Sequence, residues 1–350
     1  MTLLDDVSSL THTGSLLSAE GQITASYDLE ESDTAIGGYR ALSTFGGIRN
    51  ANASVGTVRY DGATRVHIIN GMGVTLGDSI VGLTALAAIK HRYPDILFAI
   101  YRPSRTPLFV KALYHLAAPL FGKVVELPVS LDALPSDEPK VDIGNHLFWP
   151  NFSTMPMIDF FLWALGLDPA DIPSQEKRNA WLPRLALPEL AQDWKNRPYV
   201  LLAPTASTPV RSIPSRYLPD IVNRLWAEFG LPVVGFFPIA HERYINVSRC
   251  SGSTASFLAW VRNATLLVTS DSSALHVGAG FDVPTAAFFT TIPSGLRARD
   301  YPKCAAIDLP VPALMGMHAS ARPEDLALIE RAYARLAEVD WIGALRARAT

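Results

Sequence analysis

The sequence predicts an α/β protein made of two doubly wound, Rossmann-like domains that face a cleft. Short β-branched strands alternate with helices in two separate stretches of the chain, and this alternation is typical of βαβ units with a parallel sheet. The chain has 350 residues, which is more than a single hydrophobic core usually serves. We therefore expect one domain at residues 61–185 and another at 198–322, with a small irregular or β-rich appendage at 1–60 and a C-terminal helix within 323–350.

The N-terminal 60 residues are rich in Ser, Thr, Gly and Asn, which indicates loops and a small hairpin. The first domain then begins with a β-branched strand at 65–69, a glycine-rich turn at 70–77 and a helix at 78–92 whose apolar residues recur at helical spacing. The same alternation continues with a strand at 96–101, a helix at 107–117 and strands at 124–127 and 141–143. These elements predict a parallel sheet.

The second domain repeats this pattern after a connection rich in Pro, Leu and charged residues at 172–198. Its expected elements are strands at 199–203, 232–237, 265–269 and 285–289 and helices at 218–229, 254–263 and 272–280. The final helix, at 323–338, begins with Pro and has one apolar face. We expect that face to pack back across the domain junction.

Composition excludes several classes of protein. The 30 Lys+Arg and 33 Asp+Glu leave a net charge of -3, so no global positive field attracts nucleic acid. The N-terminus lacks the basic and apolar regions of a signal peptide, and no window reaches the roughly 18 apolar residues of a membrane span. Cys250 and Cys304 stand apart from other ligand-type residues, so we expect two reduced, buried thiols, without a disulfide or a metal site. These features predict a cytoplasmic protein, at most peripheral to the inner membrane, with no transmembrane segment and no nucleic-acid partner.

The glycine-rich turn carries the first candidate site. Gly71, Gly73 and Gly77 follow a strand, where glycine lets the backbone turn tightly and approach a ligand. Asp78 is expected as the N-cap of the next helix, either as a cap only or as a general base that faces an acceptor hydroxyl in the cleft. A nicotinamide dinucleotide is disfavoured, because the spacing is G-x-G-x-x-x-G, a carboxylate opens the helix, and the next strand ends in Arg102 instead of an acidic ribose partner.

Two turns of the second domain carry further candidates. After the strand at 199–203, the hydroxyls of Thr205, Ser207 and Thr208 and the guanidinium of Arg211 make a phosphate clamp, with a plain polar turn as the alternative.

The turn after 265–269 places Asp271, Ser272 and Ser273 at a helix start, with His276 one turn along. Free N–H groups at a helix start bind anions, although capping alone also explains Asp271 and Ser272. A Ser-His-Asp hydrolase is disfavoured, because the sequence has no G-x-S-x-G elbow.

Weaker candidates lie elsewhere. Glu242 could bond the sugar hydroxyls of a nucleotide, while its neighbourhood lacks the second histidine of a zinc helix. His146 and Trp149 are expected either at the cleft edge, in contact with an acceptor, or in a buried or capping role. The apolar segment 155–167 is expected to belong to the core, and a subunit contact or a lipid-facing patch are the less favoured alternatives. Its Asp159 could face the cleft.

Taken in order, these motifs resemble the lipopolysaccharide heptosyltransferases, glycosyltransferase family 9. The resemblance covers roughly residues 64–305, and the following runs carry it: Gly77-Asp78, Ala206-Ser207, Arg211-Ser212-Ile213-Pro214, His241-Glu242, Asp271-Ser272-Ser273-Ala274-Leu275-His276 and Val283-Pro284. The runs 70–79 and 156–162 are most similar to the autotransporter heptosyltransferases, which glycosylate serines of exported adhesins from the cytoplasm.

The resemblance implies a GT-B fold, with an N-terminal acceptor domain, a C-terminal ADP-sugar domain and an inverting displacement that needs no obligatory metal or cofactor. It places Asp78 on the catalytic base. It places seven residues on positions that hold the nucleotide diphosphate and ribose: Ser207, Arg211, Glu242, Asp271, Ser272, Ser273 and His276. Where the family has lysine, tryptophan and glycine, this chain has Arg211, Ile213 and Ser273. Two separated cysteines also cannot build the four-cysteine iron site of the autotransporter group.

The predicted function is the transfer of a sugar, heptose from ADP-heptose, to a hydroxyl on an autotransporter serine or on a lipopolysaccharide core sugar. The expected partners are this nucleotide-sugar donor and one of these acceptors, and a homo-oligomer is compatible with the sequence. A non-catalytic carbohydrate- or adhesin-binding module with a degenerate donor site is an alternative, and a nicotinamide-dependent oxidoreductase is a more remote one.

Overall fold

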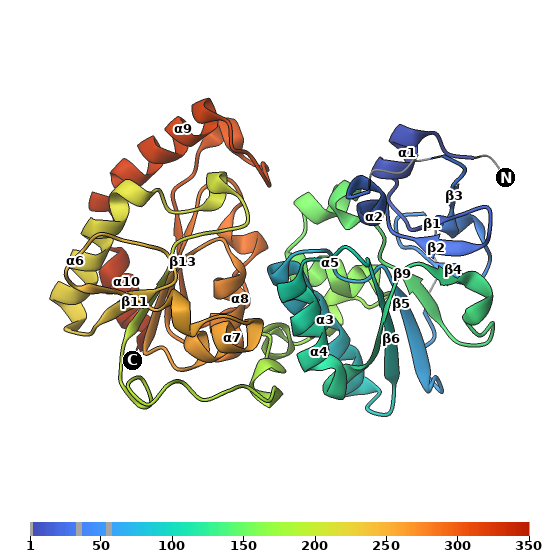
Figure 1. Cartoon of the computed structure of the whole chain (residues 1–350), viewed down its shortest axis with the longest axis horizontal. Helices are drawn as coiled ribbons and strands as arrows, with labels where there is room; N and C mark the ends of the chain where they lie inside the picture. Colours follow the sequence, from blue (N-terminus) through green and yellow to red (C-terminus); the bar gives the residue numbers. More distant parts are fainter. Residues whose placement is uncertain (1–2, 33–36, 54–57, 350) are drawn as a thin grey trace. The chain divides into compact units, whose positions relative to one another are not determined.

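The computed structural model describes residues 3–32, 37–53 and 58–349. The chain divides into two compact units, Met1–Lys177 and Arg178–Thr350. Each unit contains a parallel sheet with helices packed against it (Figure 1). The predicted α/β fold class is therefore confirmed for both halves of the chain.

The first unit is built on a parallel sheet with the strand order β4-β9-β5-β6-β7. Its strands are β4 (Ile48–Arg49), β5 (Arg65–Ile69), β6 (Leu97–Arg102), β7 (Gly122–Glu126) and β9 (Lys140–Asp142). The central strand β5 pairs in parallel with β6 on one side and with β9 on the other. After its first residue β5 is fully buried, because a central parallel strand is covered on both faces.

Three helices lie together on one side of this sheet (Figure 1). They are α3 (Leu76–Arg92), α4 (Leu108–Phe121) and α5 (Met157–Ala164). Helix α5 falls within the apolar segment 155–167 and is almost entirely buried, so the expectation that this segment belongs to the core is confirmed. Its Asp159 is also buried, and its Oδ1 accepts a hydrogen bond of 2.8 Å from Lys177 Nζ.

The other face of the sheet carries the N-terminal segment. A small antiparallel sheet has the order β3-β1-β2-β8. Its strands are β1 (Leu16–Leu17), β2 (Gln22–Thr24), β3 (Arg40–Ala41) and β8 (Val129–Ser130), and the helices α1 (Asp6–Thr11) and α2 (Ser26–Glu30) accompany it. Strands β1 and β2 form the predicted hairpin. Leu17 and Ile23 pack with Ile69 and Tyr101 of the parallel sheet, so the segment shares a core with the first unit and also supplies β4.

The second unit contains a six-stranded sheet with the order β12-β11-β10-β13-β14-β15. Its strands, all parallel, are β10 (Val200–Ala203), β11 (Val233–Gly235), β12 (Tyr244–Asn246), β13 (Leu266–Ser270), β14 (Thr285–Phe289) and β15 (Cys304–Asp308). Counted within this sheet, the order is that of the doubly wound nucleotide-binding fold. The order therefore reverses between β10 and β13.

Five helices cover the two faces of this sheet: α6 (Leu218–Phe229), α7 (Thr254–Arg262), α8 (Ser273–Gly280), α9 (Pro323–Ala334) and α10 (Trp341–Ala349). Figure 1 shows α6 and α10 on one side and α7 and α8 on the other. Alternate residues of β14 face the two layers: Ala286 and Phe288 pack in the core of α6, α9 and α10, while Ala287 and Phe289 pack with Leu275 of α8. The period of two follows from the pleat of a strand.

The C-terminal part differs from the sequence-based expectation. Helix α9 ends at Ala334 instead of 338, because the chain turns at Arg335–Ala337 and then forms α10, which was not expected. The strand β15 was also not expected. Ile329 and Tyr333 of α9 pack in the core of the second unit, and packing of this helix across the domain junction stays a prediction.

The expectation of two buried thiols is wrong for one cysteine. Cys250 is exposed at the end of a short 3₁₀ turn, whereas Cys304 is buried at the start of β15. Burial raises the pKa of the Cys304 thiol to about 12, so this thiol is protonated at neutral pH.

Candidate functional site

The turns that follow β10 and β13 hold most of the residues predicted to bind a donor. The two strands pair in parallel, with Ala203 opposite Thr269, so their carboxyl ends lie side by side. The strand order of the sheet reverses between them. Ligands of open α/β sheets bind at such a reversal, outside the carboxyl ends of the strands, and the two turns predicted from the sequence meet at this place.

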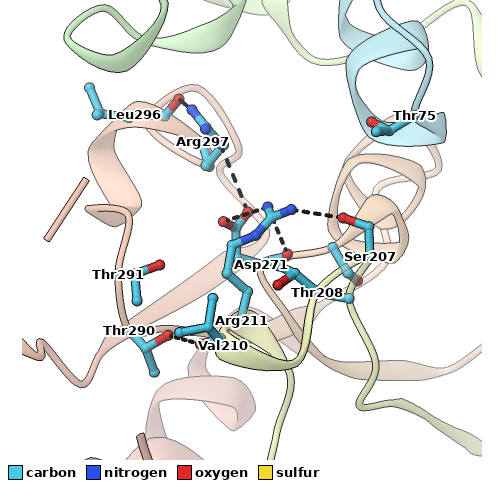
Figure 2. A network of polar contacts seen from close by, with 12 residues as sticks. Thr75, Ser207, Thr208, Val210, Arg211, Asp271, Thr290, Thr291, Leu296 and Arg297 are labelled. Atoms are coloured by element: carbon cyan, nitrogen blue, oxygen red, sulfur yellow. Dashed lines mark hydrogen bonds and ion pairs between the residues drawn. The ribbon is translucent and has the colours of Figure 1, made fainter. Parts of the chain in front are cut away.

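Arg211 joins the two turns (Figure 2). Its Nη1 lies 3.1 Å from Asp271 Oδ2, and its Nη2 donates a hydrogen bond of 2.9 Å to Ser207 Oγ. The arginine ends a 3₁₀ turn whose Val210 is buried in the core, which fixes the backbone from which the side chain extends. Asp271 is buried and Ser207 is exposed, so the guanidinium extends from the interior to the surface of the second unit.

Asp271 contacts a second guanidinium that sequence reasoning missed. Arg297 Nε lies 3.9 Å from Asp271 Oδ1, and both side chains are buried. Burial alone would raise the pKa of Asp271, but the charges of Arg211 and Arg297 outweigh it and hold that pKa below its ordinary value. Arg297 follows β14, far along the chain from the other members, and no motif marks it. We call Ser207, Arg211, Asp271 and Arg297 the arginine cluster.

Hydroxyl groups fix the shape of the turn after β10. Ser212 Oγ accepts a hydrogen bond of 2.9 Å from the Ala206 N–H and donates one of 3.0 Å to the Thr208 carbonyl. Thr208 Oγ1 donates to the Ser320 carbonyl and accepts from the Ser320 N–H. The Thr208 hydroxyl is therefore used in hydrogen bonds to the Ser320 backbone. Thr205, by contrast, is exposed and accessible to a ligand.

The start of α8 lies next to this turn. Ser272 is the N-cap residue and Ser273 the first helical residue, but the Ser272 side chain does not cap the helix. Its Oγ is 2.9 Å from Thr269 Oγ1. The first N–H groups of α8 consequently receive no side-chain cap, and N–H groups in this position attract anions.

The remaining predicted donor residues, Glu242 and His276, have different surroundings. Glu242 is exposed in the loop after β11, with Arg243 Nε 3.4 Å from its Oε1. His276 is buried, its Nδ1 is 2.8 Å from the Tyr301 hydroxyl, and Asn179 donates to its backbone carbonyl. A contact of either side chain with a donor stays a prediction.

The arrangement in the second unit is suited to an anion. Two guanidinium groups surround one carboxylate, which leaves positive charge in excess, and an exposed hydroxyl lies beside the outer guanidinium. A helix start without a side-chain cap adds N–H donors. These groups together are those that bind phosphate and diphosphate in proteins.

Asp78 occupies the matching place in the first sheet, where the strand order reverses between β5 and β9. The expectation that Asp78 caps the helix is wrong. Helix α3 begins at Leu76, and Thr75 is the N-cap, whose hydroxyl accepts from the Asp78 N–H at 3.4 Å. Asp78 lies in the first turn, where a carboxylate is stabilised by the helix dipole, and its side chain is not used as the cap.

The turn between β5 and α3 has an unusual backbone. Asn70, Met72 and Gly73 have φ angles of 49°, 66° and 68°, and non-glycine residues in this region store strain that is common at functional sites. A Cβ on Gly73 would lie 2.5 Å from His146 Cε1 and 3.0 Å from Asp78 Oδ2. Gly73 is therefore required both by its φ angle and by the close approach of these two side chains.

The buried Arg102 binds the backbone of this turn. Its Nη1 donates to the Gly71 carbonyl, and its guanidinium lies over the Tyr114 ring, 4.1 Å from the centroid. A Cβ on Gly71 would lie 2.8 Å from Ile68 Cγ2, so this glycine is also required by packing. Gly77 is the second residue of α3.

His146 and Trp149 lie in the chain segment after β9, and both are buried. His146 Nε2 is 3.9 Å from Asp78 Oδ2. The indole N–H of Trp149 donates to the Thr13 carbonyl, which ties the N-terminal segment to this turn. Burial, one of the two alternatives drawn from the sequence, is thus confirmed for both residues, and a contact with an acceptor stays a prediction.

Two kinds of feature are absent from the described part of the chain. No group of three or more His, Cys, Asp or Glu side chains there is arranged to hold a metal ion. No helix in the same ranges has both the length and the apolar character that crossing a membrane requires.

The sequence matches no protein-family model and no curated protein sequence. Among solved structures, the chain is similar to the E. coli heptosyltransferase WaaC with ADP, at 13% identity and a TM-score of 0.45, over 78% of this chain and 98% of that one. A glycosyl transferase family 9 protein from Veillonella parvula has 13% identity and a TM-score of 0.46, over 70% and 86%.

A third similar structure is the dodecameric iron-containing heptosyltransferase TibC from enterotoxigenic E. coli, in complex with ADP-D-beta-D-heptose. It has 12% identity and a TM-score of 0.42, over 64% of this chain and 57% of that one. Two of these three structural neighbours are named as heptosyltransferases and the third as a member of glycosyl transferase family 9, the family that the sequence motifs resemble. At such low identities and TM-scores we infer no substrate, metal or assembly from them.

Proposed function

We propose that this protein is an inverting glycosyltransferase that takes its sugar from a nucleoside diphosphate donor. The observation that carries the proposal is the arginine cluster at the strand reversal of the second sheet, beside the start of α8. Its charge and hydrogen-bond donors suit a diphosphate. Asp78, at the strand reversal of the first sheet, supplies the carboxylate that the chemistry needs.

In the proposed reaction, the hydroxyl oxygen of the acceptor attacks the anomeric carbon of the donor sugar. The Asp78 carboxylate accepts the hydroxyl proton. The bond from the anomeric carbon to the β-phosphate oxygen breaks, and its electron pair stays on the nucleoside diphosphate. Arg211 and the N–H groups at the start of α8 stabilise the charge that develops on this leaving group. The reaction requires Asp78 to reach a sugar whose diphosphate is held by the second unit.

We propose ADP-heptose as the donor and a hydroxyl of an autotransporter serine or of a lipopolysaccharide core sugar as the acceptor. The motif resemblance supports this choice. Thr205, Ser272 and Ser273 join the arginine cluster in binding the diphosphate. Glu242 and His276 are assigned to the ribose side of the donor, and no metal is assigned a role.

The first test is mass spectrometry of the purified protein incubated with a panel of ADP-, UDP- and GDP-sugars, which scores donor hydrolysis without a known acceptor. We expect ADP-heptose to be hydrolysed fastest. Asp78→Asn should lower transfer by roughly 10²- to 10⁴-fold, the usual contribution of a general base, while calorimetry shows unchanged ADP affinity. Turnover retained by Asp78→Asn would eliminate Asp78 as the base.

The second test concerns the arginine cluster. Arg211→Ala should weaken ADP binding by about 10- to 100-fold, because hydrogen bonds to charged groups contribute about 1.5–3 kcal/mol each. Arg216→Ala is a matched control, since Arg216 is an exposed arginine of the same unit paired with Glu330. Equal ADP affinities of the two variants, measured by calorimetry, would remove the arginine cluster from the donor site.

The alternatives drawn from the sequence have distinct outcomes. A protein that binds no nucleotide at all would instead fit a carbohydrate- or adhesin-binding module. A nicotinamide cofactor that raises the melting temperature where ADP does not would instead favour an oxidoreductase.

A further inference from the structure

Two polar side chains meet at the strand reversal of the first sheet. Asp78 belongs to the first turn of α3, which follows β5, and His146 belongs to the segment that follows β9. The two atoms that approach are His146 Nε2 and Asp78 Oδ2, at 3.9 Å. The imidazole is 3% exposed and the carboxylate 14%, so the histidine lies on the more buried side of the carboxylate.

Aromatic side chains hold the imidazole in place. The ring centroids of Phe152, Phe160 and Phe161 lie 4.6, 5.9 and 5.4 Å from that of His146. Phe160 and Phe161 belong to α5, which packs against α3. These rings fix the plane of the imidazole and with it the direction in which Nε2 points.

The N-terminal segment holds the His146 turn from its other side. Asn145 Nδ2 donates a hydrogen bond of 3.1 Å to the Leu10 carbonyl, and the Trp149 indole donates to the Thr13 carbonyl. Gly144 has a φ of 59°, and a Cβ there would collide with the Thr13 carbonyl oxygen. The segment around residues 10–13 therefore fastens the turn that carries His146.

We propose that His146 is a positioning residue for Asp78, an inference that rests on the proposed role of Asp78 as the base. The imidazole Nε2–H engages Oδ2 and orients the carboxylate so that its second oxygen meets the acceptor hydroxyl. The distance of 3.9 Å is longer than a hydrogen bond, and catalytic hydrogen bonds that are long without substrate often tighten in the substrate complex. Gly73 permits the approach, because a side chain there would separate the pair.

The kinetic test compares two substitutions at this position. His146→Phe keeps an aromatic ring among the phenylalanines but removes the N–H, whereas His146→Gln retains an N–H donor at the reach of Nε2. We expect His146→Phe to lower kcat by about 100-fold, the cost of a misplaced reacting group, with KM for ADP-heptose and the affinity for ADP unchanged. His146→Gln should recover most of kcat. His115→Phe, at an exposed histidine of α4, is the control and should match the wild type.

A spectroscopic test does not depend on turnover. In the full-length protein, Asp78→Asn should shift the imidazole nitrogen resonances of His146 and leave those of His115 in place. Absence of that shift overturns the pairing, whether or not the enzyme is active. A normal kcat for His146→Phe, or a kcat of His146→Gln as low as that of His146→Phe, overturns the positioning role. If Asp78→Asn shifts the His146 resonances but the wild type transfers no sugar, the pairing stands. The proposed function, and with it the catalytic role of the pair, is then overturned.

Discussion

Asp271 is the residue on which the geometry of the arginine cluster depends. It is the buried carboxylate between two guanidinium groups, at 3.1 Å from Arg211 and 3.9 Å from Arg297. Asp271→Asn would leave both cations without their counter-charge, and breaking a buried ion pair in this way costs about 3–5 kcal/mol. We expect a loss of this size in the free energy of urea unfolding at pH 7.

The pH dependence of that loss follows from the lowered pKa of Asp271. A carboxyl group whose pKa is lower in the folded than in the unfolded state contributes stability above the unfolded value of about 3.9. The contribution is lost as the pH falls through the folded value. The difference between wild type and Asp271→Asn should therefore narrow from pH 7 to pH 3. Asp193→Asn, at an exposed carboxylate before β10, is the control, and an Asp271→Asn protein as stable as this control would contradict the prediction.

The pKa of Asp142 is shifted in the opposite direction to that of Asp271. Burial raises its pKa, and the hydrogen bonds from Ser15 and Asn50 offset this only in part. A carboxyl group with a raised pKa binds its proton more tightly in the folded state, so stability falls as the pH rises through the interval between the two values. We expect the wild type to lose stability relative to Asp142→Asn between pH 4 and pH 7 in urea unfolding. A difference that does not change with pH would contradict this.

At the scale of elements, both candidate sites have the same origin. In each sheet the strand order reverses once beside the first strand of the βαβ series, between β5 and β9 in the first unit and between β10 and β13 in the second. In the second sheet the connections from β10 and β13 lead to α6 and α8 on opposite faces, as in a doubly wound fold. In the first sheet the connections from β5 and β9 lead to α3 and α5 on the same side. Asp78 with His146, and Arg211 with Asp271, each come from the two turns of one reversal.

Much of the parallel architecture could be predicted from the sequence, because buried parallel strands are apolar runs and their helices have a regular apolar face. The strands Arg65–Ile69 and Thr285–Phe289 and the helix Leu218–Phe229 begin and end where the sequence predicted. The strand β15 was missed because Cys304–Asp308 is not a β-branched run and is partly exposed. The end of α9 was misplaced because the apolar period continues to Leu336, which is buried although the helix has already turned.

The site was predicted less completely, for a different reason. Residues of one turn, such as Asp271 and Ser272, are visible as a local motif. Contacts between turns depend on the strand order, which the sequence does not display. Arg297 joins Asp271 from the turn after β14, and His146 approaches Asp78 from the segment after β9. The cap of α3 was misassigned because Thr75 and Asp78 are both good capping residues, and the helix begins at the earlier one.

Gly73 allows a test of how much the close packing in the turn between β5 and α3 contributes to stability. Gly73→Ala should destabilise the protein by about 1–2 kcal/mol for the left-handed backbone and by a further ~1–3 kcal/mol for overpacking against His146 and Asp78. Gly62→Ala is the control, because Gly62 has a φ of 74° but nothing within 4 Å of its would-be Cβ. We expect thermal unfolding to show the larger loss at Gly73, together with loss of transfer at that position alone. Equal losses of stability in the two variants would mean that the close approach of His146 and Asp78 to Gly73 does not add to the cost of the substitution.

At the scale of the whole molecule, the chain changes units within a few residues. Lys177 donates to Asp159 in the first unit, and Asn179 donates to the His276 carbonyl and the Tyr301 hydroxyl in the second. The two units separate at Arg178, and the large apolar cluster of the second unit draws only on residues beyond that point. All four members of the arginine cluster also lie beyond it.

The last prediction follows from that division. A fragment of residues 178–350 should fold cooperatively and bind ADP with nearly the affinity of the full chain, because both its core and its anion site are its own. A fragment of residues 1–177 should fold without binding ADP, and mixing the fragments should not tighten ADP binding. Circular dichroism and calorimetry measure these properties. A folded second fragment that fails to bind ADP would show that the first unit supplies part of the donor site, whereas ADP bound by the first fragment would move the donor site to the glycine-rich turn.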